Sequence, residues 1–383
     1  MKSRAENLPR AELNSRGKKS IEYCHPWIYQ RSIVNAEKIK DGELIGVYYE
    51  NKIQGIGFYS ADSLFAVKLL DSGLNFNDYN LEGRLRFKIQ KALEYRKTLG
   101  FGNNYRIFHA EADGIPGLFI DRYDRLIVIQ YSFNGIYKLK ESIAQIISGL
   151  LPEKSLFEIS PDNQKKWIKN EIDIPLQIEI DGIKFIINPF GQKTGFYLDQ
   201  RENRINLAKF VKPKMRVLDV FSYTGSFALY SIKSGAAAEA VDISAPALDI
   251  LKQNCEINNY TEIQTYCCEA DIALKKLKGP YDIIFLDPPA LTAKKNHKEN
   301  ALKYICRLFE LSLNLLADNG IVSVSVCSRE LTDSALNQTL LNACAGKNIR
   351  LRQIYEHGPS ADHPVLLNFP EGGYLRCLAY SRI

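Results

Sequence analysis

Two apolar segments of this chain each end in an acidic residue, a pattern typical of strands that border a binding site. Residues 217–227 read VLDVFSYTGSF, so the apolar run breaks after Asp219 into a turn of small residues. Residues 281–289 read YDIIFLDPP and end at Asp287 and two prolines. Because ligands bind outside the carboxyl ends of the strands in an open parallel sheet, we expect Asp219 and Asp287 to lie at the mouth of one crevice.

The sequence after the first strand indicates which ligand this crevice suits. A dinucleotide site would carry G-x-G-x-x-G here, so that backbone amides reach a pyrophosphate, but only Gly225 is present. The next predicted strand ends in Asp242, whose carboxylate can accept both hydroxyls of a ribose. Asp271, after the third strand, could accept from an adenine amine. A cationic nucleoside without phosphate fits this acidic crevice, and S-adenosylmethionine (SAM) is the predicted cofactor.

Each of these acids also has a structural interpretation, as a cap for a neighbouring helix or turn. For Asp219 and Asp242, ligand contact is favoured over capping because two strand-end acids occur in register. For Asp271, both interpretations stay open. The turn after Asp219 contributes four further predicted cofactor-binding residues, which are Phe221, Tyr223, Thr224 and Gly225.

Length and composition set the frame for this site. At about 150 residues per domain, 383 residues predict two or three domains, and 45% hydrophobic with 25% charged residues is typical of a soluble globular protein. No apolar run approaches the ~20 residues that span a bilayer, and no apolar signal segment follows the N-terminus, so we expect a cytoplasmic protein without membrane contact. The eight cysteines form no C-x-x-C pair, which predicts free thiols and no metal site.

The net charge of +6 is unevenly spread along the chain. Residues 1–31 carry seven basic side chains, which are Lys2, Arg4, Arg10, Arg16, Lys18, Lys19 and Arg31. A basic face of this kind can neutralise phosphates and attract a polyanion. On charge alone, an ordinary solvated surface is the favoured interpretation.

The remaining sequence predicts a three-part α/β protein. Residues 1–72 contain short β-prone runs around turns, and residues 73–187 mix strands with an amphipathic helix over 81–99. Two alternating runs flank Asp181-Gly182 and predict a hairpin over 176–187. Residues 188–383 alternate strands and helices, which predicts right-handed βαβ units and a doubly wound parallel sheet. Within them, Ser244 is an expected helix N-cap.

Five motifs resemble the class I methyltransferases that make 5-methylcytosine in large-subunit (23S) ribosomal RNA. They are GQKTGFYLDQR at 191–201, FSYTG at 221–225, DPP at 287–289, ADHPV at 361–365 and PEGGYL at 370–375. The resemblance implies an N-terminal PUA domain over 1–72, to which His25-Pro26-Trp27 is similar, and a central α/β domain over 73–187. It also implies a Rossmann-like methyltransferase domain over 188–383, SAM as methyl donor, and ribosomal RNA as the partner of the PUA domain.

The resemblance places further residues at the site. Gln200 and Arg201 match family positions near the cofactor, although N-capping and surface pairing before a helix explain them equally well. Cys327 matches the family's nucleophile and ends a predicted strand over 321–327, so it should open at the same edge as Asp287. A cysteine among valines is usually a small core residue, but the topology and the family match favour the nucleophile.

Carbon-5 methylation explains why the site would need these two groups. Carbon 5 of cytosine is a poor nucleophile until a thiolate adds at carbon 6, so the chemistry demands a cysteine such as Cys327. Asp287 would assist as a general acid at the polar edge of the base. The sequence does not identify the base that removes the carbon-5 proton. A base stacked in a helix is inaccessible, so the target cytosine should be single stranded or flipped out.

Two alternatives stay open at this stage, together with a possible homodimeric state. One is a methyltransferase that acts on an exocyclic base nitrogen and needs no cysteine, and the other is a non-catalytic RNA-binding assembly factor. The chain also departs from the family pattern, because Ala290 stands where a lysine usually follows the paired prolines. Residues 161–166 differ as well, and both departures bear on which nucleotide is modified.

Overall fold

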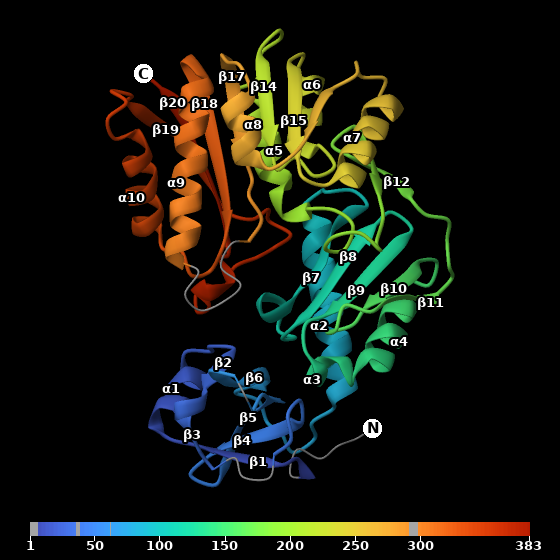
Figure 1. The fold of residues 1–383 in the computed structure, drawn as a ribbon. Helices are drawn as coiled ribbons and strands as arrows, with labels where there is room; N and C mark the ends of the chain where they lie inside the picture. Colours follow the sequence, from blue (N-terminus) through green and yellow to red (C-terminus); the bar gives the residue numbers. More distant parts are fainter. Residues whose placement is uncertain (1–6, 36–38, 62, 291–297) are drawn as a thin grey trace. The chain divides into compact units, whose positions relative to one another are not determined.

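A computed structural model describes residues 7–35, 39–61, 63–290 and 298–383 of the chain. These residues form two compact units, whose elements are labelled in Figure 1. Unit 1 comprises Met1–Leu176, Ile187–Leu198 and Ala361–Gly372, and unit 2 comprises Gln177–Ile186, Asp199–Ser360 and Gly373–Ile383. Within the described ranges, no helix is both long and apolar enough to cross a membrane.

Unit 1 begins with a β-rich part, as the sequence predicts. Its six-stranded sheet has the order β2-β6-β5-β4-β1-β3. The elements are β1 (Arg10–Leu13), α1 (Ser15–Glu22), β2 (Trp27–Tyr29), β3 (Ile33–Asn35), β4 (Leu44–Tyr49), β5 (Lys52–Tyr59) and β6 (Phe65–Ser72). Ile28, Ile45 and Val47 are fully buried and anchor its core.

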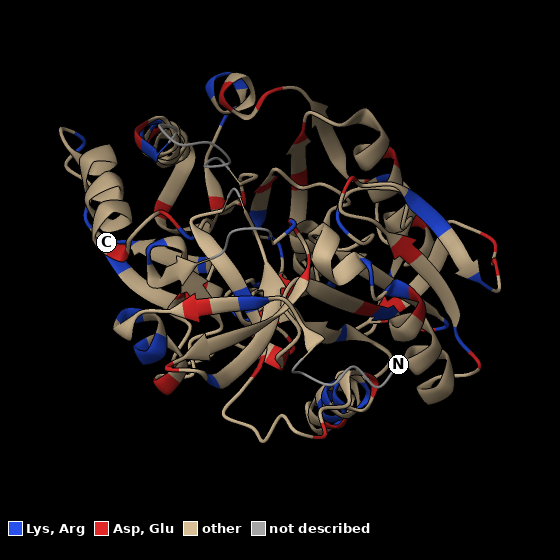
Figure 2. Ribbon diagram, turned by 90° about the horizontal axis from the view of Figure 1, so that it is seen from below, with Lys and Arg blue, Asp and Glu red and all other residues tan. Residues whose placement is uncertain are grey.

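Several basic residues near the N-terminus have specific neighbours in the described part of the chain. Lys2 and Arg4 lie outside the described residues. Arg10 pairs with Glu12 and lies over the ring of Tyr48. Figure 2 shows Lys and Arg interspersed with Asp and Glu along the ribbon.

The second part of unit 1 is a five-stranded sheet with two long helices. Its strand order is β11-β10-β9-β8-β7. The elements are α2 (Leu81–Thr98), β7 (Asn104–His109), β8 (Leu118–Tyr123), β9 (Leu126–Tyr131), α3 (Asn134–Tyr137), α4 (Lys140–Leu150), β10 (Ser155–Ile159) and β11 (Lys165–Lys169). Leu85 and Ile89 of α2 share one apolar core with Ile143 of α4 and the sheet. The helix predicted over 81–99 is therefore confirmed.

Unit 2 contains a seven-stranded sheet of order β16-β15-β14-β17-β18-β20-β19. Its strands are β14 (Arg216–Val220), β15 (Ala237–Asp242), β16 (Gln264–Cys267), β17 (Tyr281–Leu286), β18 (Leu316–Cys327), β19 (Leu351–His357) and β20 (Leu375–Arg382). Its helices are α5 (Arg201–Ala208), α6 (Ser226–Lys233), α7 (Ala245–Ile257), α8 (Ala270–Lys276), α9 (Lys298–Leu315) and α10 (Asp333–Cys344). The Rossmann-like α/β architecture predicted for this half is confirmed.

One feature of this sheet corrects the prediction of a purely parallel arrangement. Strand β20 runs antiparallel to both β18 and β19. Antiparallel neighbours need no helical crossover, and the chain between β19 and β20 contains only a short 3-10 turn at Pro370–Gly372. The parallel pairing of strands in this sheet therefore ends at β18.

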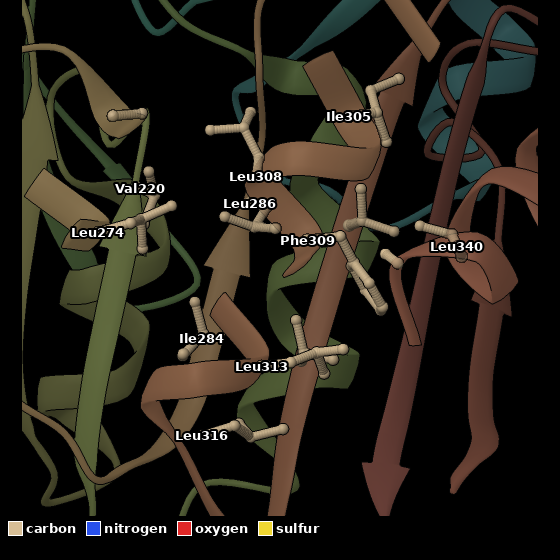
Figure 3. Packing of buried hydrophobic residues seen from close by; sticks show 14 of the residues in the cluster. Val220, Leu274, Ile284, Leu286, Ile305, Leu308, Phe309, Leu313, Leu316 and Leu340 are labelled. Carbon is tan, nitrogen blue, oxygen red and sulfur yellow. The ribbon is translucent and has the colours of Figure 1, made fainter. Parts of the chain in front are cut away.

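The core of unit 2 holds the carboxyl ends of the central strands rigidly in place. Figure 3 shows Leu286 of β17 packed among Leu308 and Phe309 of α9, with Leu340 of α10 beyond them. All four side chains are at least 95% buried. Interiors packed in this way resist small displacements, so the loops after these strands start from fixed positions.

The hairpin predicted over 176–187 is present as β12 (Leu176–Ile180) and β13 (Ile183–Ile187). Asp181 and Gly182 have φ values of 54° and 71°, as a type I′ turn requires. Most of this hairpin belongs to unit 2, because Asn254 and Asn258 of α7 hydrogen bond to the backbone of β13.

The compact units therefore divide the chain differently from the boundary expected at 187/188. Residues 187–198 and 361–372 lie in unit 1, although the sequence suggests that they belong with the second half of the chain. The three-domain division at 1–72, 73–187 and 188–383 stays a prediction.

Helix α7 begins where the sequence predicts, and this start offers a test of the fold. Ser244 is the N-cap, and its hydroxyl accepts a hydrogen bond from the amide of Ala247 at 3.3 Å. Replacing Ser244 by alanine should lower the free energy of unfolding by about 1 kcal/mol, because one helical amide loses its partner. Urea unfolding followed by circular dichroism measures this, with Ser234→Ala after α6 as a control. A variant as stable as the parent would contradict the capping role.

Candidate active site

The site lies where the strand order of the unit 2 sheet reverses. From β14, the chain builds β15 and β16 on one side and β17 and β18 on the other. Ligands of open α/β sheets bind at this switch point, outside the carboxyl ends of the strands. Val220 pairs with Leu286, and the amide of Asp287 donates to the carbonyl of Val220 at 3.2 Å. The ends of β14 and β17 therefore meet, as the sequence predicts.

The loop after β14 has an unusual backbone. Phe221 and Tyr223 have φ values of 65° and 49°, and Gly225 has a φ of 82°. A Cβ at position 225 would lie 2.4 Å from Cγ of Leu251, so the loop requires glycine there. Non-glycine residues with positive φ are costly and concentrate at ligand-binding sites.

Asp242 at the end of β15 holds this loop from the neighbouring strand. One carboxylate oxygen accepts from the amide of Tyr223 at 2.8 Å, and the other accepts from the amide of Ser244 at 2.9 Å. The carboxylate also borders a pocket of about 340 Å³. The lining residues of this pocket are Phe221, Val241, Asp242, Ile243, Cys268, Glu269, Ala270 and Tyr304.

Six of the eight residues that line this pocket were not among the predicted site residues, and Ile243 and Tyr304 are two of them. Ile243 follows Asp242 and keeps 70% of its side chain exposed, and Tyr304 reaches the pocket from α9. An apolar residue directly after a strand-end acid is a signal that could have identified Ile243. Nothing in the local sequence distinguishes Tyr304 from other residues of an amphipathic helix.

Asp219 is buried beneath the pocket and is absent from its lining. Its Oδ2 accepts from the amide of Ala228 at 2.9 Å, in the first turn of α6. Burial is the main reason that the pKa of Asp219 is raised to about 7, although the Ala228 amide opposes the shift. The nearby charges of Asp287 and Asp242 raise this pKa further. In this structure, Asp219 supports the first turn of α6.

The raised pKa of Asp219 predicts how stability depends on pH. The folded state holds this proton more tightly than the unfolded state, so stability falls as the pH rises from about 4 to about 7. Replacing Asp219 by asparagine keeps an acceptor for Ala228 and removes the titration. Between pH 4 and pH 8, the free energy of unfolding of the variant should rise by at least about 1 kcal/mol relative to that of the parent. Thermal unfolding across this range measures the difference, and parallel curves for the two proteins would contradict the assignment.

Asp271 does not line the pocket of Asp242. Its carboxylate pairs with Arg307 of α9 at 2.5 Å and with Lys275 of α8 at 3.6 Å. These contacts are ion pairs and not the capping interaction considered from the sequence, and the cofactor contact of Asp271 stays a prediction. Its neighbours Glu269 and Ala270 do line the pocket.

Gln200 and Arg201 lie away from the lining of this pocket and make specific contacts elsewhere in unit 2. The Arg201 guanidinium pairs with the carboxylate of Asp181, which also accepts from the Tyr230 hydroxyl, and so fixes the hairpin turn. The Gln200 amide donates to Oδ1 of Asp287 at 3.2 Å. Arg201 thus supports the fold, whereas Gln200 contacts one of the two predicted catalytic groups.

Cys327 ends β18, beside the strand that leads to Asp287. It is partly exposed and borders a recess of about 190 Å³ with Pro288 and Pro289, which directly follow Asp287. The other lining residues are Ile305, Val326, Ser328 and Leu331. By contrast, Cys255 and Cys377 are buried, and burial raises the pKa of each thiol to about 11. Cys327 is therefore not sealed in the core, and it borders a small recess beside the residues that follow Asp287.

Comparisons with known proteins agree with this architecture. Residues 11–72 match the PUA-like domain family, and residues 200–347 match the family described as conserved hypothetical protein 95. A Streptococcus mutans structure, provisionally described as a SAM-dependent methyltransferase, has a TM-score of 0.86 at 19% identity and covers 98% of this chain and 100% of its own. The fold is that of a methyltransferase domain joined to an N-terminal PUA-like domain.

Sequence relatives define the family more closely. The ribosomal RNA large subunit methyltransferase I of Shewanella frigidimarina is 32% identical, with 96% of this chain and 98% of the relative covered. The protein of the same name from Pseudoalteromonas atlantica has the same identity and coverage. The chain belongs to this family of PUA-containing ribosomal RNA large subunit methyltransferases.

Proposed function

We propose that this protein transfers a methyl group from SAM to carbon 5 of a cytosine in large-subunit ribosomal RNA. The observation that carries the proposal is that Cys327 opens on one recess with the prolines that follow Asp287. A methyl transfer to an exocyclic nitrogen would need no thiol at this place. Family membership supports the coarser statement, that the substrate is ribosomal RNA and the donor is SAM.

The pocket beside Asp242 fits the nucleoside part of SAM. Its acidic wall suits ribose hydroxyls. Phe221 and Ile243 offer apolar surface for an adenine ring. A related structure, provisionally described as a methyltransferase, was solved in complex with SAH. When bound, SAM supplies an electrophilic methyl group, and the chain's own residues bind and orient it.

Cys327 and Asp287 divide the remaining chemistry between them. The Cys327 thiolate adds to carbon 6 of the cytosine and forms a C–S bond, which makes carbon 5 nucleophilic. A hydrogen bond between the Asp287 carboxyl group and the polar edge of the ring stabilises the charge that develops during this addition. After carbon 5 takes the methyl group, loss of its proton and cleavage of the C–S bond restore the aromatic ring and the free thiolate.

The substrate must present the cytosine outside a stacked helix, because carbon 6 is attacked from the face of the ring. The PUA-like domain is the proposed RNA contact that holds a single-stranded or flipped-out target. The cytoplasmic location and the homodimer expected from the sequence stay predictions.

A labelled-methyl experiment tests this function directly. The purified protein is incubated with SAM carrying a deuterated methyl group and with large-subunit ribosomal RNA from a strain that lacks the gene. Mass spectrometry of the digested nucleosides should find the label in 5-methylcytidine at a single mapped position. Label in an N-methylated nucleoside would replace the proposal with exocyclic methylation, and absence of label from all nucleosides would favour a non-catalytic assembly factor.

A further inference from the structure

Two adjacent buried residues, Asp199 and Gln200, lie in the short 3-10 turn Leu198–Gln200 that leads into α5. Their side chains make contacts with different partners. Oδ2 of Asp199 accepts from the hydroxyl of Tyr374 at 2.9 Å, and the Gln200 amide donates to Asp287 at 3.2 Å. The carbonyl of Asp199 also accepts from the amide of Ser360 at 2.8 Å, which fixes the turn itself.

Tyr374 connects Asp199 with the loop of the proposed nucleophile. The carbonyl of Tyr374 accepts from the amide of Ser328 at 2.8 Å, one residue after Cys327. Cys327 itself lies opposite Leu375 in the ladder between β18 and β20. Tyr374 therefore closes the end of the ladder at the point where the Cys327 side chain leaves the sheet.

The contact with Asp287 is equally constrained. The amide of Asn203 donates to Oε1 of Gln200 at 2.6 Å, so the Gln200 side chain is oriented with its own amide toward Asp287. Asn203 is fully buried and in turn accepts from the hydroxyl of Tyr355 at 2.9 Å. Because Asn203 already fixes the Gln200 side chain, little entropy is lost when Gln200 hydrogen bonds to Asp287. Gln200 is therefore preorganised to hold that carboxylate.

We propose that Asp199 and Gln200 form a positioning bridge that fixes the spacing between Cys327 and Asp287. Asp199 acts through Tyr374 on the loop of Cys327, and Gln200 acts directly on Asp287. Neither residue touches the base. The inference rests on the proposed function, because it assigns a geometric role around the two catalytic groups of that proposal.

The test compares Tyr374→Phe with the parent protein in the labelled-methyl assay, with full-length protein and ribosomal RNA. Loss of one hydrogen bond to a charged group should lower kcat by about tenfold to a hundredfold through misplacement of Cys327. The KM for RNA and the Kd for SAM should stay within about twofold, because neither ligand contacts this hydroxyl. Tyr380→Phe on β20 is the matched control, since the Tyr380 hydroxyl has no hydrogen-bond partner among the described residues, and it should retain the parent kcat.

Two Asp199 variants separate positioning from simple destabilisation. Asp199→Asn keeps an oxygen acceptor for Tyr374 and should retain most of the activity, whereas Asp199→Ala should match Tyr374→Phe. The double variant Asp199→Ala with Tyr374→Phe should be no slower than either single variant, because both remove the same interaction. Additive decreases in kcat in the double variant would overturn the proposed bridge. A higher KM with an unchanged kcat would also overturn it.

The outcome also separates this inference from the proposed function. If Cys327→Ala is inactive while Tyr374→Phe has the parent kcat, the bridge is overturned and the chemistry stands. If Cys327→Ala keeps the parent kcat, the proposed chemistry fails and the bridge fails with it.

Discussion

Replacing Cys327 by alanine should lower the rate of methyl transfer to RNA by about 10⁴-fold or more, the scale of loss when a covalent nucleophile is removed. The reason is that carbon 5 of cytosine stays unreactive unless a thiolate adds at carbon 6. The proposed SAM pocket beside Asp242 does not include Cys327, so the Kd for SAM should stay within about twofold of the parent value. Single-turnover methylation and calorimetry measure the two quantities.

A matched control keeps this result interpretable. Cys344 on α10 is partly buried like Cys327 and lies in the same unit, but it is outside the recess of Cys327. Cys344→Ala should therefore keep the parent rate. Full turnover by Cys327→Ala would exclude the covalent route and leave methylation of an exocyclic nitrogen as the remaining chemistry. A covalent complex with RNA containing 5-fluorocytosine, absent from Cys327→Ala, would identify the adduct itself.

The elements that bear the site could be predicted from the sequence because their signals are local. The strand and turn of residues 217–227 appear as β14 and its loop, and Ser244 caps α7 as its residue type predicts. The Asp181-Gly182 hairpin was equally clear, since few dipeptides tolerate two positive φ values. Strand β20 was not predicted, because its pairing depends on the long-range return of the chain to β18.

The direction in which a strand-end acid points could not be predicted. Asp219 and Asp242 end neighbouring strands, yet Asp219 is buried against α6 and Asp242 reaches the pocket. The two differ by their depth in the sheet, because Asp219 lies opposite Ala240, two residues before Asp242, and by which amides lie within reach. Asp271 and Arg201 found ion-pair partners far along the chain, which a local pattern does not contain.

The family motifs also combine residues with different tasks. In the 191–201 motif, Thr194 lies in unit 1, where its hydroxyl donates to Asp121 at 2.6 Å. In the 361–365 motif, Asp362 accepts from the amide of Arg106 at 2.8 Å, again within unit 1. His363, one of the few histidines, lies buried beside Asp362 and serves this packing. A motif match therefore identifies the family, and only the structure separates its anchors from its site residues.

Replacing Asp242 by alanine should raise the Kd for SAM by about a hundredfold, because two charge-assisted hydrogen bonds to the ribose are lost together. The same carboxylate holds the amides of Tyr223 and Ser244, so the loop that shapes the pocket also loses its support. Asp242→Asn keeps one oxygen acceptor and should raise the Kd for SAM by only about tenfold. Isothermal titration calorimetry with SAM measures these affinities.

The effect on turnover distinguishes cofactor binding from catalysis at this position. At saturating SAM, Asp242→Ala should recover a kcat within about threefold of the parent, because Asp242 lines the proposed cofactor pocket and not the recess of Cys327. Asp249→Ala on α7 is the control, since its carboxylate is largely exposed and outside the pocket. Unchanged SAM affinity in Asp242→Ala would show that the 340 Å³ pocket is not the cofactor site. Because Asp219 is buried under the same loop without lining the pocket, Asp219→Asn should leave SAM affinity nearly unchanged, which separates the two acids that the sequence could not tell apart.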